Sequence, residues 1–518
     1  MSSHYKSFLL VIVVTALAFW LARPAFARFM SDEAFVRRRN LWLSLTLSAF
    51  LIPSFWLYMG VAAVLIWRAA RRDPNPAALY LFLLLVVPPF QAAIPGFGLG
   101  TFLFQMDHFR LLTLALVLPA ALRMSRAMKK AGNASVRRSW LAPDVFIVIY
   151  GLLPVILSMR YTSVSDSMRS VLLLGIDLLL PYYVLSRSCT SKPMLVEAIA
   201  AFALSAVILA PLALIESAKA WLLYSSISDH WRLSSNFIGY LFRGDILRAQ
   251  VTSGQSIILG NFYAVGLGLW LYLQYGLTGW RRWLGTAAMV GGLFAALSRG
   301  PWVGAAVCGF AFFAVGPNAT TRVLKLVGVS AVVVAVVLAS PMGATIVDHL
   351  PFIGTVDAGN VTYRQAMIDR SWLVIQQNPL FGSPYFLSYM EDLRTGEGII
   401  DLLNAYLTIG MAYGLVTLAA LLLFFTTVAF KCLQVTRINA LRDPDTSRLG
   451  AALFASLSGA MVILYTVSNY LSVPYIYIGL TALMVAYSRI PTFVPEPEVQ
   501  AGLPVARVDR RWSTSIRP

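Results

Sequence analysis

The sequence predicts an all-α membrane protein that crosses the bilayer many times. Of its 518 residues, 58% are hydrophobic and only 12% are charged. The mean hydropathy of +0.72 lies far outside the range of soluble globular proteins. No apolar run alternates at period two over successive segments, as the strands of a membrane barrel do. These observations exclude a soluble enzyme and predict helical spans.

We expect about 12 to 14 transmembrane helices, because a helix needs roughly 20 apolar residues to cross the hydrocarbon core with its backbone paired. The clearest apolar runs cover residues 41–67, 77–94, 168–185, 194–215, 257–277, 402–430 and 449–467. Shorter or weaker runs cover residues 8–21, 109–122, 145–159, 283–297, 302–315, 323–338 and 473–487.

The basic links between these runs predict the orientation. The link 123–138 contains Arg126, Lys129, Lys130 and Arg137 and no acid, which indicates the cytoplasmic side. Alternation from there places the basic segments 68–72, 187–192, 281–282, 322–325 and 431–448 on the same side. The basic segment 23–39 disagrees, because it falls outside if residues 8–21 span. That first run is therefore expected either to lie on the membrane surface or to act as an uncleaved signal.

The same alternation divides the chain into six parts. We predict N-terminal transmembrane helices in 1–215, an outer loop in 216–256, central transmembrane helices in 257–340, a large outer loop in 341–401, C-terminal transmembrane helices in 402–489 and a cytoplasmic tail in 490–518. The tail is rich in proline and scattered charge, which predicts disorder.

Several functions are excluded by what the sequence lacks. The net charge of +18 comes from bases in short links between apolar runs, which is a topology signal and not a nucleic-acid surface. There is no CxxC, HExxH or Gly-rich GK[ST] motif, and the four histidines are scattered. We therefore predict no metal, no other cofactor and no nucleic acid partner. The three cysteines are expected to remain unpaired.

Arginines on the predicted outer face are unusual, because the positive-inside bias works against them there. A guanidinium presents planar, forked donors that stay charged, which suits a diphosphate at a membrane surface. The alternative is that each arginine snorkels to headgroups or pairs with a nearby acid. The candidates are Arg243, Arg248, Arg299, Arg364 and Arg370.

Acids and histidines supply the candidates for a proton acceptor. Asp401 precedes the run 402–430 and is expected either to act as a general base or to cap the helix that begins near residue 402. His230 and His349 are alternatives, although each is more often an ordinary loop histidine. Asp177 lies within an apolar run and must be paired, protonated or facing a cavity.

Four motifs carry a resemblance to a known family. They are GDILRAQ at 244–250, LSRG at 297–300, YRQAMIDRSWLVIQQNPLFG at 363–382 and EGIIDLLNAYLTIGMAYG at 397–414. In this order they resemble the bacterial O-antigen ligases and Wzy-type polysaccharide polymerases, over roughly residues 242–420. The resemblance implies a GT-C-like fold, a site facing the periplasm at the inner membrane, and a glycan donor on undecaprenyl diphosphate. Arg248, Arg299 and Arg364 occupy the family's arginine positions.

One departure from the ligase pattern bears on the function. Ligases that act on the lipid A core carry a histidine immediately before the NxYL segment, whereas this chain has Leu403. We therefore expect a polymerase of lipid-linked repeat units, with Asp401 as base and Asn404 either orienting a sugar hydroxyl or bonding within the helix bundle. Its expected partners include a chain-length regulator and a repeat-unit flippase. The alternatives are a ligase or O-glycosylation transferase, and a lipid-linked oligosaccharide flippase.

Overall fold

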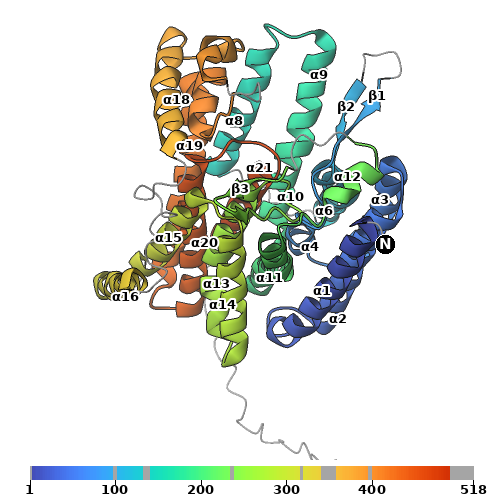
Figure 1. Cartoon of the computed structure of the whole chain (residues 1–518), viewed down its shortest axis with the longest axis vertical. Helices are drawn as coiled ribbons and strands as arrows, with labels where there is room; N and C mark the ends of the chain where they lie inside the picture. The colour runs from blue at the N-terminus through green and yellow to red at the C-terminus, as the bar shows by residue number, and fades with distance from the viewer. Residues whose placement is uncertain are drawn as a thin grey trace, which may run out of the picture.

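The computed structural model describes residues 3–96, 102–131, 141–233, 239–315, 319–339, 358–394 and 400–490, most of them in helices (Figure 1). The first helices are α1 (Ser3–Phe26), α2 (Asp32–Leu51), α3 (Phe55–Arg72), α4 (Pro76–Leu83), α5 (His108–Leu112), η1 (Thr113–Val117), α6 (Leu118–Ala131), α8 (Ala142–Ser158), α9 (Val164–Leu173), η2 (Leu174–Leu179), α10 (Leu180–Ser188) and α11 (Lys192–Lys219). The later ones are α12 (Ser225–His230), α13 (Ser256–Leu273), η3 (Gln274–Gly276), α14 (Trp280–Ala295), α15 (Arg299–Ala314), α16 (Ala319–Ala339), α18 (Ala358–Gln377), η4 (Phe386–Leu393), α19 (Ala405–Asn439), α20 (Pro444–Leu464) and α21 (Val473–Arg489).

Strands in the described ranges form only two small antiparallel hairpins. In the first, β1 (Ala92–Pro95) pairs with β2 (Phe102–Met106), and in the second, β3 (Phe242–Arg243) pairs with β4 (Ile246–Leu247). The all-α class predicted from the sequence is therefore confirmed.

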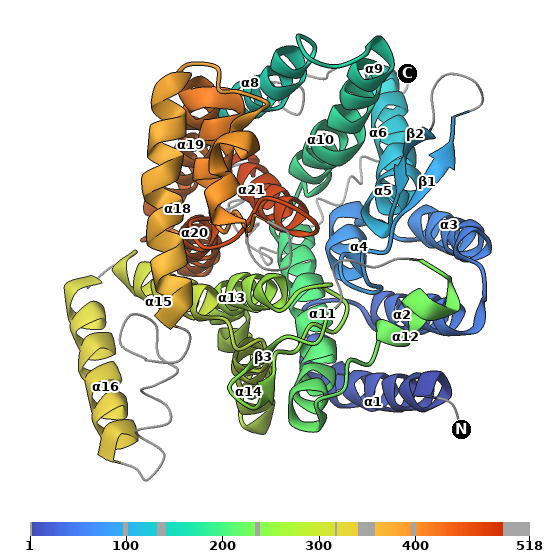
Figure 2. The same ribbon diagram turned by 45° about the horizontal axis from the view of Figure 1, so that its top comes forward.

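Seven helical segments within the described ranges are long and apolar enough to cross a membrane. They are Ser3–Phe26, His108–Ala127, Val164–Ser188, Lys192–Lys219, Ser256–Gly276, Ala405–Asn439 and Pro444–Leu464. The chain is thus a polytopic membrane protein, while the larger total of spans and the GT-C-like arrangement stay predictions. In Figure 2, α11 runs through the middle of the molecule, where it packs against α1, α4, α13 and α14.

The apolar run 41–67, predicted as one span, is two helices. Chain direction changes after α2 because Pro53 has no N–H to donate and the preceding Ile52 is extended, with φ −86° and ψ 120°. The end of α3 therefore returns to the start of α2, where Arg38 and Asp73 form a buried ion pair with 3.0 Å between Nε and Oδ2.

This reversal of chain direction explains why the basic segment 23–39 disagreed with the orientation predicted from the other basic segments. Arg38 also pairs with Glu197 at 2.8 Å, and Lys192 pairs with Asp443 at 3.1 Å. The basic segments around residues 23–39, 68–72, 187–192 and 431–448 thus meet at one end of the molecule, which we call the basic end. The α1–α2 turn belongs to this end because the break at Pro53 adds a crossing of the bundle.

A second correction concerns the run 77–94, which is not a transmembrane helix. Helix α4 has only 8 residues and ends at Leu83, five residues before the pair Pro88 and Pro89. A helix of that length spans about 12 Å, too little for the hydrocarbon core. Its side chains are almost completely buried, so the apolar run forms protein core.

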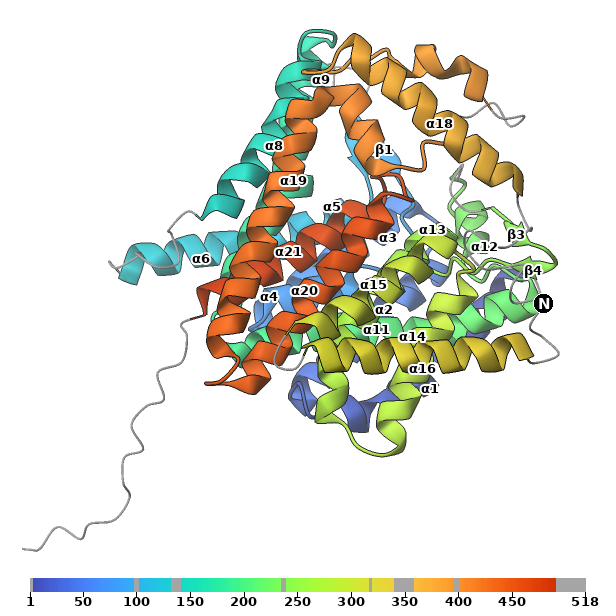
Figure 3. The same cartoon turned by 90° about the vertical axis from the view of Figure 1, so that its left-hand side faces the viewer.

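The described part of the predicted outer loop 341–401 is a helical cap. In Figure 3, α18 lies across the upper end of the molecule, above the start of α19. The cap has its own small hydrophobic core of Met367, Val374, Ile375, Met390 and Met411. Because α19 leads from this cap to Asn439, near the basic end, the cap lies at the opposite end, which we call the site end.

Candidate functional site

Charged groups from four chain segments meet around Arg364 of α18. The half-buried guanidinium interacts electrostatically with Asp401, Arg243, Arg299 and Tyr465. Burial lowers the pKa of Arg364, as do the like charges of Arg243 and Arg299, while Asp401 raises it. The structure therefore brings together three of the five predicted arginines and the predicted base, although 121 residues of sequence separate Arg243 from Arg364.

Asp401 lies in the short segment between the cap and α19. Its backbone N–H donates to the Tyr363 hydroxyl at 2.9 Å, which ties it to α18. The side chain is accessible to solvent, yet protein atoms surround it on most sides. This partial burial raises the pKa of Asp401, and the nearby Arg364 opposes the rise. A solvent-accessible carboxylate with a raised pKa can accept a proton.

Asn404, and not Asp401, caps α19. The Asn404 side-chain oxygen accepts from the backbone N–H groups of Tyr406 and Leu407 at 3.0 and 3.1 Å. The helix begins at Ala405, so the alternative that Asp401 is the cap is excluded. Asn404 is only 2% exposed, and both bonds hold its side chain within the bundle.

The SRG motif forms the start of α15. Ser298 precedes the helix in extended conformation, and Arg299 is its first residue. Gly300 is required for close packing, because a Cβ there would lie 2.0 Å from Oγ1 of Thr466. Pro301 is tolerated in the first turn, where its missing N–H costs no helical bond. Arg299 is thereby presented at the site end of the bundle.

The β3–β4 hairpin carries Arg243 and ends just before Arg248. The Arg243 guanidinium donates to the carbonyl of Leu297 at 2.7 Å, directly before the SRG motif. The N–H of Arg248 donates to the carbonyl of Leu241 at 2.9 Å, and the Arg248 side chain is half-buried. The hairpin thus lies against the start of α15.

Arg370 is held elsewhere. It lies about 9 Å further along α18 than Arg364. Its guanidinium pairs with Asp392 at 3.3 Å and donates to the carbonyl of Tyr389 at 3.1 Å. These contacts place Arg370 in a small polar pocket of about 320 Å³ between α18 and η4. The structure does not bring it to the cluster around Arg364.

The NPLFG motif attaches the cap to α19. Helix α19 is broken at Gly414, whose φ is +79°, and Leu415 N–H bonds to the carbonyl of Pro379 at 2.8 Å. The N–H of Ser383 bonds to the carbonyl of Met411 at 2.9 Å. A Cβ at Gly414 would lie 2.1 Å from the Leu380 carbonyl oxygen, so the backbones approach closely only because this residue is glycine.

The connector 465–472 between α20 and α21 belongs to the site, and the sequence analysis missed it. Tyr465 interacts with Arg364, and Thr466 packs on Gly300. The hydroxyl of Ser468 donates to the carbonyl of Leu402. Tyr470 donates to the side chain of Gln255. The one available signal was the group of polar residues Ser468, Asn469 and Tyr470 between two apolar runs.

The remaining candidates lie outside the cluster. His230 stacks on His4 with ring centroids 4.6 Å apart, and His349 lies outside the described residues. Asp177 pairs with Arg110 at 2.9 Å, so it has the structural partner that its apolar surroundings require. Among the described residues, no group of three or more His, Cys, Asp or Glu could hold a metal ion.

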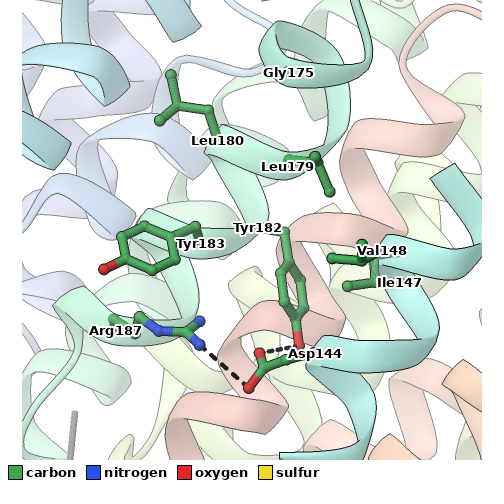
Figure 4. Close-up of a pocket in the computed structure, with 9 residues that line it drawn as sticks. All are labelled: Asp144, Ile147, Val148, Gly175, Leu179, Leu180, Tyr182, Tyr183 and Arg187. Carbon is green, nitrogen blue, oxygen red and sulfur yellow. Dashed lines mark hydrogen bonds and ion pairs between the residues drawn. The ribbon is translucent and has the colours of Figure 1, made fainter. Parts of the chain in front are cut away.

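An apolar cavity of about 380 Å³ lies between α8, η2 and α10, away from this site (Figure 4). At one edge, Asp144 accepts from Tyr182 at 3.0 Å and pairs with Arg187 at 3.2 Å and Arg489 at 2.8 Å. Arg187 lies in the last turn of α10, five residues before Lys192, and belongs to the basic segment 187–192. This edge of the cavity therefore faces the basic end. None of the predicted site residues lines the cavity, which is therefore not the candidate site.

One region of the chain matches a known protein family. Residues 284–422, from α14 into α19, match the family model described as O-antigen ligase. The matched region contains Arg299, Arg364, Asp401 and Asn404 and confirms the resemblance found from the motifs. No curated protein is significantly similar to the chain.

Proposed function

From the O-antigen ligase domain at residues 284–422, we propose that this membrane protein is a glycosyltransferase that polymerises repeat units carried on undecaprenyl diphosphate. The single observation that carries the proposal is that Arg243, Arg299 and Asp401 meet around Arg364. Three cations in a partly buried site repel one another, and a bound dianion relieves that repulsion.

The arginines would bind the donor. Guanidinium groups form charge-assisted, bidentate bonds to phosphate oxygens and need no metal ion to do so. As the sugar leaves, negative charge develops on the diphosphate oxygen. Arg299 and Arg364 would stabilise this charge more strongly in the transition state than in the ground state, and that difference accelerates the reaction.

Asp401 would act as general base towards the acceptor. A sugar hydroxyl of the second substrate loses its proton to the Asp401 carboxylate as its oxygen attacks the anomeric carbon of the donor. The bond between the anomeric carbon and the diphosphate oxygen breaks, and undecaprenyl diphosphate departs with the electron pair. The raised pKa of Asp401 makes its carboxylate a stronger base than that of an ordinary exposed aspartate.

Leu403 favours polymerisation over ligation. In the family that the motifs resemble, the ligases that act on the lipid A core have a histidine at this position. A leucine side chain cannot accept a proton. Asp401 lies two residues earlier, beside Arg364. We propose a site that faces the periplasm at the bacterial inner membrane, in cooperation with a repeat-unit flippase and a chain-length regulator.

Complementation of a deletion strain tests the function. The variants are Arg299→Ala, Arg364→Ala and Asp401→Asn, with Arg370→Ala as a control on the same helix as Arg364, and each is checked for membrane abundance. We expect the three site variants to leave single repeats on their carriers at the periplasmic face, while Arg370→Ala restores long chains.

Other outcomes would identify a different function. Complete lipid-linked chains that fail to reach their final acceptor would indicate a ligase or O-glycosylation transferase. Single repeats that accumulate facing the cytoplasm would indicate a flippase. Full complementation by all three site variants would show that the arginines and Asp401 are not the catalytic site.

A further inference from the structure

Glu216 is a buried carboxylate that the proposed reaction does not use. It lies near the site end of α11, and its side chain belongs to a residue only 1% exposed. Oε1 accepts from the backbone N–H of Leu223 at 2.9 Å. Oε2 accepts from the N–H groups of Gln250 and Val251 at 2.9 and 2.8 Å. Burying a carboxylate is costly, and these three bonds compensate for its lost hydration.

Two of the three bonds hold the turn that follows Arg248. Next to Glu216, the hydroxyl of Ser217 donates to the carbonyl of Leu247 at 2.9 Å. The N–H of Ala249 donates to the carbonyl of Ala295 at 3.0 Å. With the bond from Arg248 to Leu241, every residue from 247 to 251 has a backbone group fixed by a partner outside the turn.

Val251 shows why the turn needs this support. Its φ is +46°, in the left-handed region that β-branched residues rarely adopt. Such a conformation is strained and persists only where the surroundings hold it. The bond from the Val251 N–H to Glu216 is one of the contacts that hold it.

The turn is connected to the arginine cluster through the end of α14. Ala295 binds the turn, and two residues later the carbonyl of Leu297 accepts from Arg243. Arg299 then begins α15. A shift of the turn would therefore move Arg248 and disturb the contact that orients Arg243.

We propose that Glu216 is a positioning residue, which fixes the turn 247–251 so that Arg248 and Arg243 meet the diphosphate of the lipid-linked donor. This inference rests on the proposed function. A carboxylate is suited to the task because both of its oxygens only accept. Glutamine offers one accepting oxygen, and its NH₂ group would point at backbone N–H donors. Glu216→Gln therefore disturbs the turn with almost no change in volume.

Binding and kinetics of the full-length protein test the proposal. Undecaprenyl diphosphate in detergent micelles is the binding probe, and donor and acceptor KM are measured separately. We expect Glu216→Gln to weaken probe binding and raise the donor KM by roughly 10–100-fold, as small displacements of binding groups do, and to leave the acceptor KM unchanged. Ser217→Ala, which removes one bond to the same turn, should cause a smaller loss of the same kind.

A double-mutant cycle separates positioning from a general loss of stability. If Glu216 acts through Arg248 as well as Arg243, Glu216→Gln should cause a smaller loss in a chain that already carries Arg248→Ala than it causes in the wild type. Glu33→Gln is the matched control, since this glutamate is exposed and lies in α2 at the basic end. It should bind the probe as the wild type does.

The two proposals fail in different ways. If the wild-type protein does not bind undecaprenyl diphosphate, the proposed function is wrong. If the wild type binds and Glu216→Gln binds equally well, or if the losses of Glu216→Gln and Arg248→Ala add in full, Glu216 is not a positioning residue for the donor site.

Discussion

Arg364 lies between two like charges and one opposite charge, and this balance connects the structure to the proposed chemistry. Arg243 and Arg299 disfavour its charged form, whereas Asp401 favours it. Arg364 in turn affects Asp401: it lowers the pKa of the Asp401 carboxyl, while burial raises it. The Asp401 carboxylate and the Arg364 guanidinium therefore influence each other's protonation directly.

The first prediction at the residue scale concerns pH. A general base must be deprotonated to work, so kcat/KM falls as the pH drops through the pKa of Asp401. Because burial raises that pKa above its usual range, we expect the acid limb at a higher pH than an ordinary exposed aspartate would give. A pH profile of the purified enzyme measures this. Asp401→Asn should abolish the limb together with most of the activity, and an unchanged limb in that variant would assign it to another group.

The second prediction concerns the geometry of Arg364. Lysine keeps the charge and loses the planar fork, so Arg364→Lys should retain more activity than Arg364→Ala, which we expect to lose roughly 100- to 1,000-fold. Rates of glycan transfer at saturating acceptor measure both. Equal rates for Arg364→Ala and the wild type would remove this residue from the site.

At the scale of elements, the NPLFG motif acts through contacts between its backbone and that of α19. The NPLFG segment docks on the break in α19 at Gly414 and so fixes α18, with Arg364, beside Asp401. The partly buried connector 465–472 contacts the same site through Ser468, which bonds to Leu402, and through Thr466, which packs on Gly300.

The break in α19 yields a third prediction. Gly414→Ala adds a Cβ that would meet the Leu380 carbonyl at 2.1 Å, in a backbone with φ +79°. We expect this variant to displace the cap and reduce transfer at least tenfold, because the geometry of the site depends on that docking. Gly309→Ala is the control, since no atom lies within 4 Å of a Cβ added there in α15. Normal activity of Gly414→Ala would show that the cap tolerates the change.

At the scale of the whole molecule, buried ion pairs join the helices at the basic end. Arg38 has a completely buried side chain and contacts both Asp73 and Glu197, so it connects the ends of α2, α3 and α11. Removing one partner leaves a buried charge without compensation, which typically costs 3–5 kcal/mol.

The fourth prediction follows from this network. Arg38→Met should lower the thermal stability of the detergent-solubilised protein strongly, because Asp73 then stays buried and unpaired. Asp73→Leu added to Arg38→Met should recover part of the loss. The fraction of protein that stays monodisperse after heating measures the stability of the single and the double variant. A stable single variant would show that the pair contributes little.

The sequence analysis predicted the fold class well because hydropathy is a local property. Its errors fell at prolines: residues 41–67 were taken as one span and residues 77–94 as another, although Pro53 and the pair Pro88 and Pro89 interrupt these runs. The assignment of the helix cap was open for a similar reason. Asp401 and Asn404 are both good caps, and only the helix start at Ala405 decides between them.

By itself the sequence determined that this protein is a polytopic helical membrane protein, with motifs that resemble those of O-antigen ligases and an unusual set of arginines predicted to face outward. Tertiary structure decided which of those arginines meet. It brought Arg243, Arg299 and Asp401 to Arg364, held Arg370 in a separate pocket, and added the connector 465–472. The physical reason is that apolar patterning specifies each helix separately, whereas convergence depends on packing between helices far apart in the chain.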